Sequence, residues 1–189
     1  MKYSPFTSAP RLITLTAICS AALLTACAPM SSMTSYSQDK LPETVKVPAN
    51  NRVAMQTVGV GDITYECRAK KDMAGQFEWA FVGPDAALND RSGAKIGKYY
   101  GPPATWENMD GSKITGTQVA VAPASIGNIP FQLVKANPAM GSGAMSGVTY
   151  IQRVATIGGV PPATACASSN LGTKQTVKYQ ADYIFWKAS

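Results

Sequence analysis

The sequence predicts an all-β domain, either an antiparallel β-sandwich or a closed barrel of about eight to ten short strands, with little helix. Short runs of alternating apolar and polar residues recur along the chain, and turn-forming residues separate them, among them 16 Gly and 13 Pro. No segment shows the apolar periodicity of an amphipathic helix of about three turns. A sheet of this kind protects its edges by closing on itself or by packing against a second sheet.

The strand-like runs follow one another from residue 52 to the C-terminus, with expected bounds of 52–60, 62–68, 77–82, 95–100, 105–107, 112–121, 129–135, 148–155 and 176–187. In the last run the apolar residues alternate, so that Val177, Tyr179, Ala181, Tyr183 and Phe185 share one face. A further short run at 86–88 follows Gly83-Pro84-Asp85, and 84–88 is the place where a short helical piece is expected.

The N-terminus predicts export. Lys2 and Arg11 precede an apolar stretch, Leu12–Leu24, which is shorter than the roughly 20 residues that span a bilayer. The stretch ends in Leu-Thr-Ala-Cys, which resembles the lipobox of bacterial lipoproteins with Cys27 as the acylated residue. We therefore expect a lipoprotein signal peptide at 1–26, a flexible tether at 27–44 and one β domain at 45–189.

Acylation of Cys27 would anchor the protein stably, because each buried methylene of a fatty-acid chain such as palmitate contributes about 0.8 kcal/mol. Ala28 would then be the second residue of the mature chain, which by analogy with enterobacterial sorting favours the outer membrane. The membrane, through the lipid on Cys27, is thus an expected partner. Loss of Lys2 and Arg11 with the signal peptide reduces the formal net charge from +6 to +4.

The composition excludes several classes of protein. With no His in the chain, there is no His-dependent nucleophile, no His general base and no His metal ligand. The scattered positive residues form only one cluster, Arg68-Ala69-Lys70-Lys71, which does not resemble the dense basic stripe of a nucleic-acid-binding protein. We expect no nucleic-acid partner, no metal and no cofactor.

The four Cys have three expected fates. Cys19 leaves with the signal peptide, Cys27 is acylated, and Cys67 and Cys166 remain in an oxidising compartment in which disulfides persist. A Cys67–Cys166 disulfide would close a loop of about 100 residues and stabilise the fold by roughly 4–5 kcal/mol in the chain-entropy model.

Four residues are candidates for binding. Tyr99, Tyr100 and Trp106 are interpreted either as an exposed aromatic rim for a small molecule, glycan or peptide, or with Trp106 as a core anchor beside a hairpin. Arg153 interrupts an apolar strand, so it either reaches the surface or is buried beside a carboxylate. Its possible carboxylate partners are Glu66, Glu78, Glu107 and Asp182. These residues favour a non-catalytic module that binds a small molecule, a glycan or a protein through its loops.

Two alternatives remain open. Without His, a hydrolase acting on envelope glycans would need a pair of carboxylates, and its candidate catalytic residues are Glu66, Glu78, Glu107 and Asp110. Because Glu66 and Glu78 lie opposite the aromatic face of their strands, they are also interpreted as ordinary solvent-facing residues. The second alternative is a purely structural envelope lipoprotein with no ligand.

Several motifs, taken in order, are similar to the domain of unknown function 3455, a family of secreted bacterial and fungal proteins. They are GDITYEC (61–67), FEWAFVG (77–83), YGPPATWENMDGSKIT (100–115), IPFQLVKA (129–136), GVTYIQRVATIGGVPPATAC (147–166) and ADYIFW (181–186). The resemblance covers roughly residues 45–188. It implies a single secreted domain and carries over no activity and no functional residues.

Overall fold

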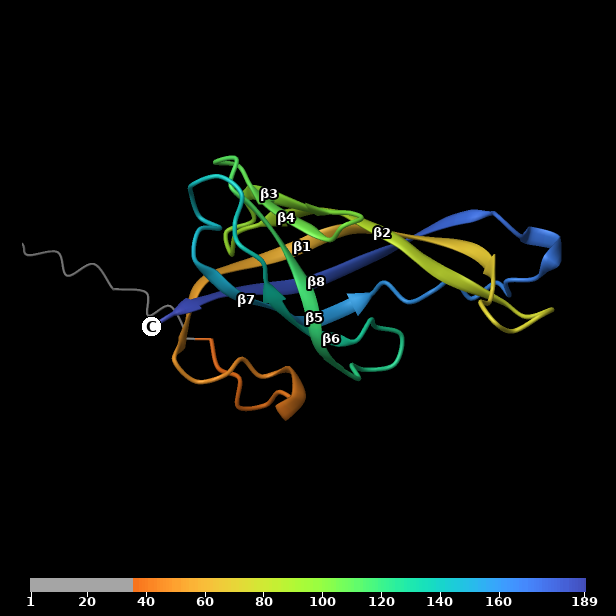
Figure 1. Ribbon diagram of the computed structural model, residues 1–189, viewed down its shortest axis with the longest axis horizontal. Coiled ribbons are helices and arrows are strands. Elements are labelled where there is room, and N and C mark those ends of the chain that lie inside the picture. The colour runs from red at the N-terminus through yellow and green to blue at the C-terminus, as the bar shows by residue number, and fades with distance from the viewer. Residues whose placement is uncertain (1–35) are drawn as a thin grey trace, which may run out of the picture. The chain divides into compact units, whose positions relative to one another are not determined.

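The computed structural model describes residues 36–189, which form a closed antiparallel barrel of eight strands in sequence order (Figure 1). β8 pairs with β1 and so closes the barrel. The strands are β1 (Asn51–Ala69), β2 (Phe77–Asn89), β3 (Lys95–Tyr100), β4 (Thr105–Asn108), β5 (Lys113–Ala122), β6 (Phe131–Ala136), β7 (Val148–Gly158) and β8 (Lys174–Ala188). The helical elements in the described part are two 3-10 turns, η1 (Glu43–Val45) and η2 (Ser168–Asn170). The all-β prediction is confirmed.

Two strands are longer than the sequence indicates. β1 joins the runs expected at 52–60 and 62–68, and β2 passes without interruption through the expected break and the expected helical piece at 84–88. Pro84 stays in the strand opposite Ile63. Gly83 lies so close to the carbonyl of Gly101 that a Cβ atom would collide with it. Gly83 therefore allows the Gly101 carbonyl to approach β2 closely, and neither Gly83 nor Pro84 ends the strand.

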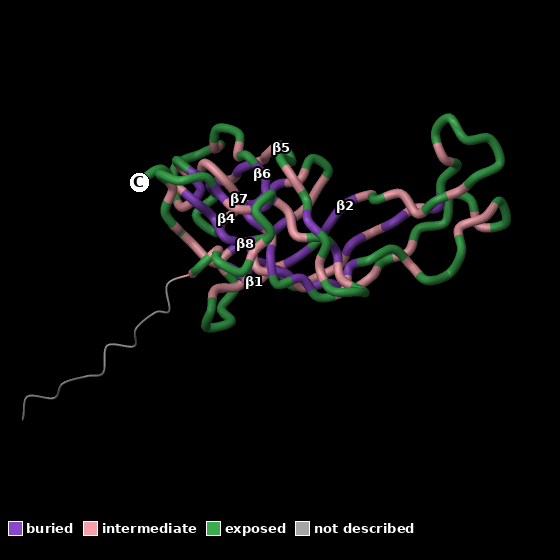
Figure 2. Tube along the Cα trace, turned by 90° about the horizontal axis from the view of Figure 1, so that it is seen from below, coloured by how far each residue is buried: buried purple, intermediate pink, exposed green. Residues whose placement is uncertain are grey.

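β1, β2 and β8 extend beyond the barrel as a three-stranded arm. The pairing of β7 with β8 ends at Gly158 opposite Tyr179, and the pairing of β2 with β3 ends at Asp85 opposite Tyr100. Beyond these points, residues 63–69, 77–84 and 174–177 pair only with one another, and we call them the arm. Figures 1 and 2 show the arm projecting from the body of the barrel, with most of its far end exposed.

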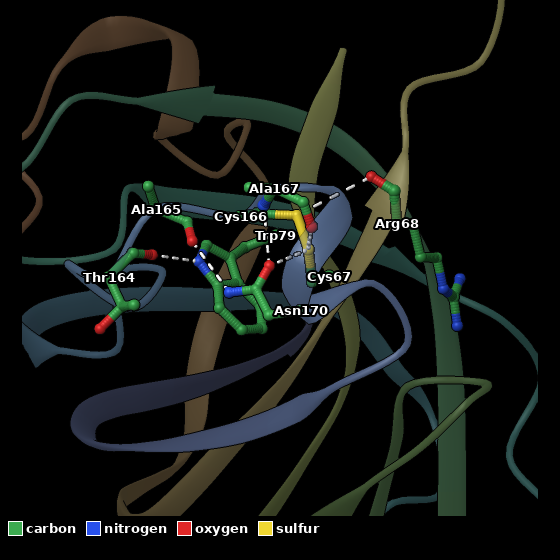
Figure 3. Close-up of a disulfide and its surroundings, with 8 residues drawn as sticks. All are labelled: Cys67, Arg68, Trp79, Thr164, Ala165, Cys166, Ala167 and Asn170. Atoms are coloured by element: carbon green, nitrogen blue, oxygen red, sulfur yellow. Dashed lines mark hydrogen bonds between the residues drawn. A yellow bond between two sulfur atoms is a disulfide. The ribbon is translucent and has the colours of Figure 1, made fainter. Parts of the chain in front are cut away.

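The predicted disulfide between Cys67 and Cys166 is present at the arm, with Cα atoms 5.4 Å apart (Figure 3). It joins β1 to the connection between β7 and β8. Two polar contacts hold the same connection: Trp79 Nε1 donates to the Thr164 carbonyl at 2.7 Å, and Asn170 Nδ2 donates to the Ala165 carbonyl at 2.9 Å. The disulfide thus ties a long loop to a part of the sheet that has little core of its own.

The main core fills the interior of the barrel, and β8 supplies its most continuous face. The predicted alternation on this strand is confirmed, because Tyr179, Ala181, Tyr183 and Phe185 are all buried in the same cluster. β1, β3 and β4 add inward-facing residues to it in the same way, so successive side chains alternate between the interior and the outer wall.

A second cluster lies on the outer wall, where residues 36–47 pack against β6, β7 and β8. Gln152, which is fully buried, holds this segment: it donates to the Val45 carbonyl at 2.6 Å and accepts from Tyr36 Oη at 2.7 Å. Burial, with a smaller contribution from Asp182, raises the pKa of Tyr36 to about 12. Residues 36–44, expected to belong to a flexible tether, are therefore held against the barrel.

The expected signal peptide at 1–26 and the lipidation residue Cys27 lie outside the described residues. Within residues 36–189, no helix is long and apolar enough to cross a membrane.

Candidate functional site

A cavity of about 310 Å³ enters the barrel wall and reaches its aromatic core. Its lining residues come from β2 to β7 and from the loop that precedes β4. They are Phe81, Tyr99, Ala104, Trp106, Gly116, Gln118, Gln132, Val134 and Arg153. The volume falls at the lower end of the range of about 300–1,000 Å³ that is usual for small-molecule sites. The cavity brings together three of the four predicted binding residues, which lie on three different strands.

The short length of β4 explains why the wall has an opening here. Its pairing with β5 ends at Thr105 opposite Thr115, whereas β5 continues to Ala122. Beyond Thr115, β5 pairs only with β6, so one of its edges has no neighbouring strand. Gln118 on this edge and Ala104 in the loop before β4 line the cavity at that gap.

The predicted exposed rim is wrong for two of its three aromatic residues. Tyr99 and Trp106 are 5% and 1% exposed, and they face the interior, where their rings stack with centroids 4.6 Å apart. Tyr183 packs against both rings from behind, at 5.0 Å from Tyr99 and 5.9 Å from Trp106. Trp106 is therefore a core anchor, the other interpretation left open by the sequence, and it also forms part of the cavity wall.

The indole N–H of Trp106 is buried and has no hydrogen-bond acceptor within residues 36–189. A buried donor without a partner costs roughly 1–3 kcal/mol relative to a paired one. A lining residue of the cavity thus carries an unsatisfied donor.

Arg153 faces the interior and has no carboxylate partner. Its neighbour Gln152 points to the outer wall, and because side chains alternate along a strand, Arg153 points to the cavity that it lines. The expected ion pair is absent: no carboxylate of the described part lies within ion-pair distance, since Glu66 pairs with Arg68 and Asp182 with Arg91.

The Arg153 guanidinium is held by a backbone carbonyl instead. Nε and Nη2 both donate to the carbonyl of Pro130, at 3.2 and 2.9 Å. Nη1 has no acceptor in residues 36–189. The Arg153 guanidinium therefore places one positive charge at the cavity, and its Nη1 remains free to donate hydrogen bonds.

Two further tyrosines lie in the core behind the aromatic wall of the cavity. Tyr183 and Tyr179 are buried with their hydroxyl oxygens 3.2 Å apart. Burial raises the pKa of Tyr183, Tyr179 and Tyr99, and the nearby positive charge of Arg153 lowers the pKa of each by a smaller amount. These tyrosines are neutral at ordinary pH, and Arg153 is the charged residue that lines the cavity.

The walls of the cavity differ in polarity. On the side of β2 to β4 lie the aromatic residues and Ala104, including Phe81, which is 54% exposed at the opening. On the side of β5 to β7, Gln132 Nε2 donates to Gln118 Oε1 at 2.7 Å, and Arg153 lies on the next strand. Phe81, Gln118 and Gln132 were not among the residues predicted from the sequence. For Phe81, its place on a strand face shared with Trp79 was a usable signal, whereas nothing local marked the two Gln residues.

The fourth predicted binding residue, Tyr100, lies outside this cavity. Tyr100 Oη donates to Glu107 Oε2 at 2.7 Å, and Lys98 Nζ lies 3.5 Å from the same oxygen. Glu107 and Lys98 instead line a second, more open hollow of about 330 Å³ that includes Met109.

The four candidate catalytic carboxyls lie apart, and three of them, Glu66, Glu107 and Asp110, belong to separate polar networks. Glu66 pairs with Arg68 at 2.9 Å, and Glu78 is exposed on the arm. Asp110 accepts from the backbone N–H groups of Ser112 and Ala144, at 2.9 and 2.7 Å, and so holds two loops together. None of the four lines the cavity that contains Trp106 and Arg153.

The electrostatics of these carboxyls do not suit a general acid, which needs a raised pKa. The hydrogen bond from Arg68 lowers the pKa of Glu66, the hydrogen bond from Tyr100 lowers the pKa of Glu107, and the hydrogen bond from Ser112 lowers the pKa of Asp110. Within residues 36–189, no group of three or more Asp, Glu or Cys side chains could hold a metal ion. The geometry supports recognition of a ligand by an aromatic wall and one cation.

Comparison with known proteins gives one match. The family described as "Protein of unknown function (DUF3455)" matches residues 48–187, which is most of the chain. No curated protein and no solved structure matches it.

Proposed function

The chain belongs to the DUF3455 family of proteins of unknown function, and we propose that its barrel is a binding module that holds a small molecule in the cavity beside Trp106. The observation that carries this proposal is the convergence of Tyr99, Trp106 and Arg153, from β3, β4 and β7, on one opening in the wall. A purely structural barrel would gain nothing from a charged group directed into an aromatic interior, because desolvation of an ion opposes folding.

The proposal includes the location of the protein. It is exported and anchored to the outer membrane through acylated Cys27, and the barrel binds its ligand in the cell envelope. The order of basic, apolar and small residues before Cys27 supports this placement. The disulfide between Cys67 and Cys166 also supports it, because disulfides persist in the oxidising compartments outside the cytoplasm.

The first test fills the cavity. The full-length protein is titrated with 1-naphthoate, a compact aromatic probe, and binding is followed by ligand-detected NMR. Ala104→Leu places extra methyl groups in the cavity, whereas Ala94→Leu adds the same volume at an exposed turn residue. We expect saturable binding, with a Kd on the order of millimolar or tighter for a ligand of this size. We expect Ala104→Leu to weaken it about tenfold and Ala94→Leu to leave it unchanged.

A second variant tests the same cavity in case Ala104→Leu does not fold. Phe81→Ala removes a ring that is 54% exposed, and Met73→Ala removes a side chain that is 51% exposed on the turn between β1 and β2. Both should keep the melting temperature of the wild type, and only Phe81→Ala should weaken binding of 1-naphthoate. Equal binding by all four variants would place the probe elsewhere, and no binding to the wild type would support the purely structural alternative.

A further inference from the structure

We propose that the cavity selects planar aromatic monocarboxylates, with Arg153 as the residue that binds the anion. This inference rests on the proposed function, since it names the class of ligand for the same site. The observations that carry it are the charge of the cavity, the free Nη1 of Arg153 and the segregation of the cavity walls.

The charge of the cavity argues for an anion with a single negative charge. Arg153 is the one charged residue among the lining residues, and the buried tyrosines behind the aromatic wall stay neutral. A carboxylate would neutralise Arg153 without leaving excess charge in a partly dehydrated site. A phosphate dianion would leave its second negative charge uncompensated. The planar guanidinium fork also matches the geometry of a carboxylate.

A donor without an acceptor supports the same ligand. Arg153 lines the cavity and uses Nε and Nη2 on the Pro130 carbonyl, which leaves Nη1 without an acceptor in residues 36–189. A ligand carboxylate could accept from Nη1, and charge-assisted hydrogen bonds are among the stronger ones in proteins.

The segregated walls argue for an aromatic body on the ligand. Phe81 and the stacked pair of Tyr99 and Trp106 present aromatic surface on the β2 to β4 side. Arg153 and the hydrogen-bonded pair of Gln118 and Gln132 lie on the β5 to β7 side. A flat ring with a carboxylate at one edge matches this arrangement, because the ring packs on aromatic surface while the carboxylate reaches the polar side. The volume of about 310 Å³ limits the ligand to one or two fused rings.

The test compares two probes that differ in charge and hardly in shape. 1-Naphthoate and 1-naphthamide are titrated separately into the full-length protein, and binding is followed by ligand-detected NMR. A hydrogen bond to a charged group is worth about 1.5–3 kcal/mol, so we expect the carboxylate to bind about 10- to 100-fold more tightly than the amide.

Substitutions at residue 153 assign the preference to the arginine. Arg153→Gln should remove the preference for the carboxylate and leave binding of the amide within about twofold. Arg153→Lys keeps the positive charge but loses the planar pair of guanidinium donors, so it should retain part of the preference for the carboxylate over the amide. Arg52→Gln, the same substitution at an exposed residue outside the cavity, should change neither probe. The melting temperature of each variant is measured, because Arg153 also binds the Pro130 carbonyl.

The outcomes separate the two proposals. If both probes bind equally and Ala104→Leu weakens both, the cavity is a binding site but the anion inference is wrong. If 1-naphthyl phosphate binds more tightly than 1-naphthoate, the assignment to monocarboxylates is wrong. If neither naphthyl probe binds in a way that Ala104→Leu reduces, both the proposed function and this inference are overturned.

Discussion

Tyr99 and Trp106 lie directly opposite each other on β3 and β4, and their rings stack at an angle of 16°. Trp106 is both a core residue and part of the cavity wall. Its strand, β4, is too short to pair with the second half of β5, and the gap beside β5 leaves one side of Trp106 open to the cavity. The stability of the barrel and the shape of its proposed site thus depend on the same pair of rings.

The burial of Trp106 predicts a large loss of stability on truncation. Trp106→Ala should reduce the free energy of unfolding by about 3–5 kcal/mol, since it removes a fully buried aromatic side chain and its stacking contact with Tyr99. Met109→Ala, at a side chain that is 74% exposed, should change it by less than about 0.5 kcal/mol. Urea denaturation followed by circular dichroism measures both. A loss below about 1 kcal/mol for Trp106→Ala would show that the ring does not anchor the core.

The disulfide is predicted to stabilise the fold and to order the arm. Cys67 and Cys166 are separated by 99 residues in the sequence, and replacement of both by Ala should cost about 2–5 kcal/mol. Amide hydrogens of residues 164–170, which contact the arm through Trp79 and the disulfide, should exchange faster in this variant. The wild type in reducing buffer is the matched comparison and should behave like the double variant. Unchanged stability in both would mean that the bond contributes nothing to the fold.

The buried tyrosines predict unfolding in alkali. Burial raises the pKa of Tyr99, Tyr179 and Tyr183 above the value of about 10 that they have in the unfolded chain. Below pH ~10 these residues are protonated in both states, so their contribution to stability is fully present. It is lost as the pH rises through the raised values of the folded state.

The ultraviolet absorbance of tyrosinate, recorded together with circular dichroism during a pH titration, tests this. We expect the three tyrosines to ionise only as the β signal is lost, whereas protein in urea should ionise with a midpoint near pH 10. Complete ionisation near pH 10 with the fold intact would contradict the burial of these tyrosines.

The proposed anchor predicts a change of location in one Cys variant. Cys27→Ser removes the acylated thiol, so the protein should leave the membrane fraction or accumulate with its signal peptide uncleaved. Cys19→Ser changes a cysteine inside the expected signal peptide and should leave the mature protein in the membrane fraction. Fractionation, immunoblotting and metabolic labelling with a palmitate analogue measure both effects. Membrane association and labelling that survive Cys27→Ser would exclude acylation at this residue.

Regular alternation made part of this structure predictable from the sequence. The face of β8 that carries Tyr179, Tyr183 and Phe185 follows from its period of two. The disulfide follows from the expectation that two Cys remain in the chain after export. The full length of β2 was not predictable, because Gly83 and Pro84 are residue types typical of turns. In this strand a glycine is needed at residue 83 because the Gly101 carbonyl lies against it.

Three of the residues that line the site were predictable from the sequence, but the form of the site was not. Tyr99, Trp106 and Arg153 were recognisable as unusual residues, yet their convergence depends on barrel closure and on the early end of β4. The same long-range geometry decides that Arg153 binds the Pro130 carbonyl and not a carboxylate. Local sequence carries no signal for either relationship.

The most direct test of the central claim is a crystal structure of the protein with 1-naphthoate. We expect electron density for the naphthalene ring against Trp106 and Phe81, with the carboxylate within hydrogen-bond distance of the Arg153 guanidinium. Density for the probe at another surface, with the cavity beside Trp106 holding only solvent at saturating 1-naphthoate, would contradict the claim.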